Sequence, residues 1–179
     1  MKGNRQFNLF ILKAAALFVI WQVLYFFWIN PSTGLEMWLT SRTAAVSTQA
    51  MQWVGYDAHY FDVPGETGNQ SVSQIYLDGR PLLGIADSCN ALTLIMLFVG
   101  FIIAYPGPLN RKIWFIVGGS LLIFFVNVTR ALTLIFNFMY SKSTFDFNHK
   151  YTFTILVYLC VFGLWMLWAK RYGTNLRST

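Results

Sequence analysis

The chain has 179 residues, of which 56% are hydrophobic and only 11% are charged. Its formal net charge is +6, but no basic stripe with interleaved aromatic side chains lies in a polar region, which argues against nucleic-acid binding. Four long apolar segments within this length predict an all-α polytopic membrane protein, a single domain over residues 1–179, in preference to a soluble all-helical core.

The four apolar segments are the expected transmembrane helices. Each reaches the ~20 residues, or the ~17 of the short limit, that a helix needs to cross the hydrocarbon core. The first is longer than the apolar part of a cleavable signal peptide and has no cleavage site after it, so we expect it to remain as an anchor. The spans cover about residues 7–29, 89–105, 113–140 and 151–169.

The distribution of charge predicts the orientation. Basic residues precede the first span, follow the fourth, and lie between the second and third as Arg111 and Lys112. All acidic residues fall in segments 30–88 and 141–150. The positive-inside rule therefore predicts cytoplasmic termini, with these two segments on the outer face of a bacterial inner membrane.

The first part of the outer loop, residues 30–88, predicts a helix at the membrane interface. Residues 35–54 carry a tryptophan near each end, with Glu36, Arg42 and many small polar residues between them. This pattern favours a helix that lies on the membrane over a fifth span.

The second part of the outer loop predicts a short hairpin. Residues 73–77 and 80–85 flank Asp78-Gly79, a favoured two-residue turn between antiparallel strands. The hairpin would deliver the chain directly to Cys89.

Three polar residues are expected at the same outer face. Cys89 begins the second span, Arg130 lies inside the third, and His149 comes two residues before the fourth. Ionisable groups at membrane depth are costly and commonly functional. In the first turn of a helix capped by Asp87 or Ser88, Cys89 would experience the positive end of the helix dipole, which favours a thiolate.

The position of Arg130 also constrains the third span. Seventeen residues from Ile113 to Arg130 amount to about 26 Å of helix, close to the full thickness of the hydrocarbon core. Because the apolar run continues to Tyr140, we expect this helix to tilt, kink or break near residues 127–130.

Each of these residues also has a plain structural interpretation. Boundary cysteines are commonly inert, His149 suits an interfacial position, and Arg130 suits a pairing with Asp87 or Asp146. Only the combination of a thiol, an imidazole and a guanidinium at one face indicates a thiol-nucleophile site.

Other chemistries have less support in the sequence. A metal site made of Cys89, His149 and His59 lacks ligand spacing. The depth difference between Cys89 and Cys160 argues against a disulfide, and no C-x-x-C pair suggests redox chemistry. No nucleotide or flavin fingerprint is present, so we expect neither metal nor cofactor.

At three motifs the chain resembles the exosortase/archaeosortase family of multi-spanning cysteine transpeptidases, in particular the compact exosortases found in Bacteroidetes. The motifs are DSCNAL (87–92), NVTR (127–130) and Asn148-His149. The resemblance implies that Cys89 is the nucleophile and that Arg130 and His149 are the other catalytic residues. Neighbouring polar residues that would position the substrate are Asp87, Asn90 and Asn127. The chain departs from the family in Ala91, where glycine is usual, and in about four spans where eight are common.

The resemblance also implies a substrate class. Such enzymes cleave secreted proteins that end in a sorting tail, made of a short motif, one apolar helix and a basic cluster. The acceptor would be water, a membrane lipid or a glycan. The alternative is a non-catalytic membrane scaffold or assembly subunit that retains the site as a relic.

Overall fold

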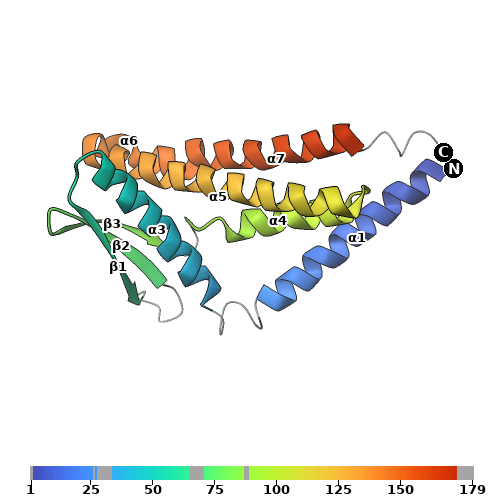
Figure 1. The fold of residues 1–179 in the computed structure, drawn as a ribbon, viewed down its shortest axis with the longest axis horizontal. Coiled ribbons are helices and arrows are strands. Elements are labelled where there is room, and N and C mark those ends of the chain that lie inside the picture. Colours follow the sequence, from blue (N-terminus) through green and yellow to red (C-terminus); the bar gives the residue numbers. More distant parts are fainter. Residues whose placement is uncertain (1, 26, 28–33, 65–70, 87–88, 173–179) are drawn as a thin grey trace.

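The computed structural model describes residues 2–25, 27, 34–64, 71–86 and 89–172. Three helices run along its longest axis, namely α4 (Leu92–Ala104), α5 (Leu109–Tyr140) and α7 (Phe153–Tyr172), and α1 (Lys2–Leu24) lies obliquely to them (Figure 1). The start of α1, the turn between α4 and α5, and the end of α7 lie at one end of the molecule. Helix α3 (Leu35–Trp53) and a small sheet lie at the other end.

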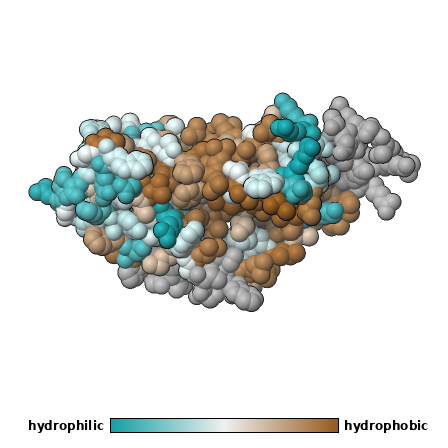
Figure 2. Space-filling model, viewed as in Figure 1, coloured by the Kyte–Doolittle hydropathy of each residue, from teal (hydrophilic) through white to brown (hydrophobic). Residues whose placement is uncertain are grey.

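The helical surface is suited to a membrane. Helix α5 and the segment Lys142–Tyr172 are long and apolar enough to cross a bilayer, and Asn8–Leu24 and Leu92–Ala104 are shorter apolar helices. Large apolar side chains point outward along them, such as Trp114, which is 75% exposed. Figure 2 shows hydrophobic surface over the middle of the molecule and hydrophilic surface over the sheet end. Soluble monomers rarely expose apolar surface of this extent, so the surface agrees with the expected helical membrane protein.

The second expected span is shorter in the structure than the sequence suggested. Helix α4 begins at Leu92 instead of Cys89 and has 13 residues. The side-chain Oδ1 of Asn90 accepts a 2.9 Å hydrogen bond from the Leu92 backbone N–H, which satisfies a donor at the helix start. At the other end, Pro106 and the positive φ of Gly107 stop the helix. Cys89 therefore lies just before the helix and not in its first turn.

The third span is one continuous helix. Helix α5 runs without a break through residues 127–130 and contains 32 residues, which corresponds to a length of about 48 Å. This length exceeds the ~30 Å hydrocarbon core. Beyond Arg130 the helix continues to Tyr140, and this part packs against the sheet through the buried Ile135.

The predicted hairpin is present as strands β2 (Ser71–Leu77) and β3 (Arg80–Ala86). Leu77 pairs with Arg80 across Asp78-Gly79, and both turn residues have positive φ, as a two-residue type I′ turn requires. The sequence did not indicate β1 (Ala58–Pro64), which pairs with the other side of β2. The result is an antiparallel three-stranded sheet in the order β1-β2-β3.

The sheet packs against α3 and α5. A shared core joins all three elements, and its buried members are Ala44, Met51, Ala58, Ile75, Ile85 and Ile135. The predicted helix over residues 35–54 is confirmed, but its small polar residues are its buried face. Thr43 and Thr48 donate hydrogen bonds to backbone carbonyls one turn earlier in α3, so their hydroxyls remain satisfied where the helix meets the sheet.

Candidate active site

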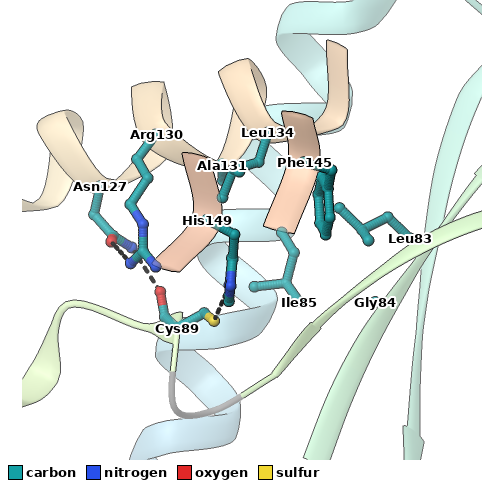
Figure 3. Close-up of a pocket in the computed structure, with 10 residues that line it drawn as sticks. All are labelled: Leu83, Gly84, Ile85, Cys89, Asn127, Arg130, Ala131, Leu134, Phe145 and His149. Carbon is teal, nitrogen blue, oxygen red and sulfur yellow. Dashed lines mark hydrogen bonds between the residues drawn. The ribbon is translucent and has the colours of Figure 1, made fainter. Parts of the chain in front are cut away.

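Cys89 and His149 lie side by side, although 60 residues separate them in sequence. Cys89 follows β3 closely and precedes α4, and its Sγ atom lies 3.6 Å from the Nε2 atom of His149 (Figure 3). Both side chains are partly buried. This is the contact distance for a hydrogen bond between a thiol and an imidazole, the arrangement in which a base can take the thiol proton.

A short irregular helical segment carries His149 to this position. Helix α6 (Lys142–Phe147) turns back from the end of α5, and the π-helical segment η3 (Asn148–Thr152) follows it before α7 begins. A π turn widens the helix locally and is frequent at functional sites. The Phe145 ring stacks on the His149 ring with a centroid separation of 5.8 Å and an interplanar angle of 12°, which holds the imidazole plane.

Asn127 on α5 connects Arg130 to Cys89. Its Nδ2 donates a 3.0 Å hydrogen bond to the backbone carbonyl of Cys89. Its Oδ1 lies 3.5 Å from Nη1 of Arg130, which stands nearly one turn further along α5. Asn127 is only 1% exposed. This buried amide therefore fixes the backbone of Cys89 and the guanidinium of Arg130 relative to each other.

Arg130 has donor capacity that the described part of the chain does not use. Its Nε atom is buried and has no hydrogen-bond partner among the described residues. A guanidinium carries five N–H donors in a planar fork. Because Arg130 lines the same pocket as Cys89 and His149, its free donors are available to an oxygen atom of a ligand bound there.

Asn90, another predicted site residue, faces away from the pocket. Asn90 is buried, and its Nδ2 faces α3, 3.4 Å from the carbonyl of Glu36 and 3.5 Å from Oγ1 of Thr40. It anchors the segment before α4 and does not line the pocket.

Because α4 begins at Leu92 with Ala91 as its N-cap residue, the predicted cap by Asp87 or Ser88 is wrong. Asp87 and the side chain of Asp146 lie outside the described residues, so a pairing of Arg130 with either aspartate stays a prediction.

The other cysteine and histidine are separate from this site. Cys160 is a free thiol on α7. His59 lies on β1 and bonds to Asp57 at 2.9 Å on the exposed surface. Within the described ranges, no three cysteine, histidine or acidic side chains group together as metal ligands.

A small pocket opens at the cysteine, with a volume of about 50 Å³. This volume is enough for a few water molecules. The sequence analysis did not indicate six of its lining residues. They are Leu83, Gly84 and Ile85 of β3, Ala131 and Leu134 of α5, and Phe145. Helical spacing from Arg130 could have found Leu134, which lies one turn further on, but no sequence pattern connects β3 to Arg130.

Taken together, the fold and the pocket define a helical membrane protein with a cysteine–histidine pair and an arginine at one end of its bundle. The family model described as transmembrane exosortase (Exosortase_EpsH) matches residues 1–169. The chain therefore belongs to the transmembrane exosortase family, as its three motifs predicted. No curated protein and no solved structure matches the chain.

Proposed function

We propose that this protein is a membrane-embedded cysteine transpeptidase or protease that cleaves the C-terminal sorting tail of secreted proteins through a thioester on Cys89. The observation that carries the proposal is the 3.6 Å separation of Cys89 Sγ and His149 Nε2 in a pocket that Arg130 also lines. Membership of the exosortase family supports the same chemistry.

The first half of the reaction uses all three side chains. His149 accepts the thiol proton, and the Cys89 sulfur attacks the carbonyl carbon of the scissile peptide bond. The guanidinium of Arg130 donates hydrogen bonds to the oxyanion that develops. The tetrahedral intermediate then collapses, the C–N bond breaks, and protonated His149 transfers its proton to the leaving amine. The products are a thioester on Cys89 and the released tail.

The second half resolves the thioester. An acceptor amine or water attacks the thioester carbonyl while His149 removes its proton, and the C–S bond breaks to regenerate the thiol. The acceptor is water, a membrane lipid or a glycan. We place this chemistry on the outer face of a bacterial inner membrane, with the termini of the chain in the cytoplasm. The reason is that all acidic residues fall in segments 30–88 and 141–150, while Arg111, Lys112, Lys170 and Arg171 flank the helix ends away from the candidate site.

The experiment that tests the proposal uses a secreted reporter that ends in a motif, an apolar helix and a basic cluster. It is expressed together with the wild-type chain or with Cys89→Ala, and loss of the tail is followed by gel shift. Processing should require Cys89. If Cys89→Ala sustains both the processing and the biological role of the wild-type protein, the scaffold alternative replaces the enzymatic one.

A further inference from the structure

Strand β3 is an edge of the sheet. It pairs with β2 on one side only. Among the described residues, no hydrogen bond joins its outer edge to another element. The N–H and C=O groups along such an edge are a template for another extended chain. In the middle of this edge Gly84 is exposed, so the backbone there is accessible.

The free edge of β3 faces the candidate active site. Three successive residues of the strand, Leu83, Gly84 and Ile85, line the pocket. Leu83 and Ile85 are two residues apart, so their side chains point to the same face of the sheet, where both contact the core shared with α5. Gly84 lies between them and exposes the backbone of this edge strand to the pocket. Gly84 has no side chain, and it contributes backbone alone. The opposite wall carries Arg130 and His149 (Figure 3).

The strand also leads directly to the nucleophile. Ala86, the last residue of β3, is three residues before Cys89, a reach of at most about 10 Å. A peptide paired with the outer edge of β3 would therefore pass between the strand on one side and the thiol, imidazole and guanidinium on the other. A protease holds the substrate segment around the scissile bond in an extended form next to the nucleophile. Addition of that segment as a strand to a sheet edge is a recurring way to bind an extended peptide.

We propose that the segment of the substrate around its scissile bond binds as a fourth strand on the outer edge of β3. Main-chain hydrogen bonds to this edge supply affinity without regard to substrate sequence. The side chains of Leu83 and Ile85 border alternate substrate positions. The inference rests on the proposed function, because it assigns the place where the peptide lies during attack by Cys89.

The test uses peptide electrophiles, because main-chain pairing is independent of side-chain identity. Acetyl-oligoalanyl chloromethyl ketones with one, two and four alanines are reacted with the purified full-length Cys160→Ala protein in detergent. The thiolate displaces chloride, and mass spectrometry follows the new S–CH2 bond on Cys89. Iodoacetamide, which has no peptide to pair, serves as the reference reagent for intrinsic thiol reactivity.

Strand addition predicts two results. The alkylation rate should rise about fivefold for each hydrogen bond gained as the peptide lengthens. In the four-alanine reagent, N-methylation should lower the rate about fivefold at alternate amides and leave the amides between them almost unaffected, since only every second residue of a strand faces its partner. A rate that is independent of length, or an N-methyl effect without alternation, would overturn the inference.

Two variants provide a matched control on the protein. Gly84 itself is unsuitable, since an added Cβ would lie 2.6 Å from Cγ1 of Val72. Leu83→Lys places a charge in the pocket beside β3 and should slow the four-alanine reagent at least about fivefold relative to iodoacetamide, whereas Val63→Lys on the opposite edge strand β1 should not. Equal rates in the two variants would count against the β3 edge. Failure of the proposed function gives a different result. If His149 does not activate Cys89, iodoacetamide reacts at the same rate with the parent protein and with its His149→Ala variant.

Discussion

The side-chain amide of Asn127 donates a 3.0 Å hydrogen bond to the backbone carbonyl of Cys89, and this contact joins the long helix α5 to the segment that carries the thiol. The same amide touches the guanidinium of Arg130. The position of the nucleophile therefore depends on a residue that takes no part in bond formation or proton transfer in the proposed mechanism. This makes Asn127 a positioning residue in the proposed site.

Replacement of Asn127 should weaken both the fold and the site. Asn127→Ala leaves the Cys89 carbonyl without its partner, and loss of a buried hydrogen bond costs about 1–3 kcal/mol. We expect a lower midpoint of thermal unfolding in detergent and slower alkylation of Cys89 by iodoacetamide. Asn137→Ala, on the same helix but with an exposed bond to Thr144, is the matched control. A Cys89 alkylation rate unchanged by Asn127→Ala would remove its positioning role.

The chain has two histidines, which allows a direct comparison of their roles. His149→Ala should slow processing of a tail-bearing reporter by about 10²–10⁴, the usual contribution of a proton-transfer group. His59→Ala should process normally, since His59 bonds to Asp57 on the exposed surface. Membrane levels of both variants, measured by immunoblot, separate a chemical defect from a folding defect. Equal processing by the two variants would show that His149 is not the base.

Arginine and lysine should differ at position 130. Arg130→Lys retains a positive charge but loses the planar fork that can hold Asn127 and an oxyanion at once. We expect processing to fall by about 10²–10³, as for loss of one oxyanion donor, with little change in protein level. Arg42→Lys on α3, away from the pocket, should process at the normal rate. The measurement is single-turnover cleavage of the reporter, and a wild-type rate in Arg130→Lys would exclude a role for the fork.

Two adjacent glycines on α5 should respond in opposite ways to alanine. A Cβ at Gly119 would collide with the Phe98 ring of α4, while a Cβ at Gly118 would meet nothing within 4 Å. Gly119→Ala should therefore lower stability by about 1–3 kcal/mol through overpacking, and Gly118→Ala should be neutral or stabilising, by up to about 1 kcal/mol. The unfolding midpoints of both variants are measured by heating in detergent, with size-exclusion chromatography to quantify the folded protein that remains. Similar midpoints for the two variants would contradict the close approach of α4 and α5.

The orientation of the chain is tested by cysteine labelling in a Cys89→Ala, Cys160→Ala background. A cysteine at Asn110, in the first turn of α5, should be protected from a membrane-impermeant maleimide added outside the cell. A cysteine at Ser143, at the opposite end of the bundle, should be labelled. Labelling of position 110 from outside would reverse the topology and place the candidate site on the cytoplasmic face.

The sequence was most informative where local chemistry decides the structure. Asp78-Gly79 fixed the hairpin because few residues adopt the two positive φ angles of its turn. Arg130 stood out because ionisable groups are rare in apolar segments, and His149 because it directly precedes such a segment on the same predicted face. Strand β1 was not predicted, since its existence depends on pairing with β2 and not on a strong local pattern.

The expectations that failed concern helix limits and tertiary contacts. The start of α4 is set by Asn90, whose side chain bonds to the backbone of Leu92, and no sequence pattern distinguished it from Cys89 or Ser88. The role of β3 in the pocket arises from the way the sheet packs on α5, which is a contact between distant parts of the chain. The π turn that carries His149 likewise had no counterpart in the apolar periodicity.

The most direct test of the cysteine mechanism is the processing rate of Cys89→Ser. Serine is close to cysteine in size, so the variant should insert in the membrane at the wild-type level. Its hydroxyl is a far weaker nucleophile than a thiolate, and the proposed mechanism therefore predicts that the tail-bearing reporter remains uncleaved while the enzyme is present in full amount. Cleavage of the reporter by Cys89→Ser at the wild-type rate would contradict a thioester on Cys89.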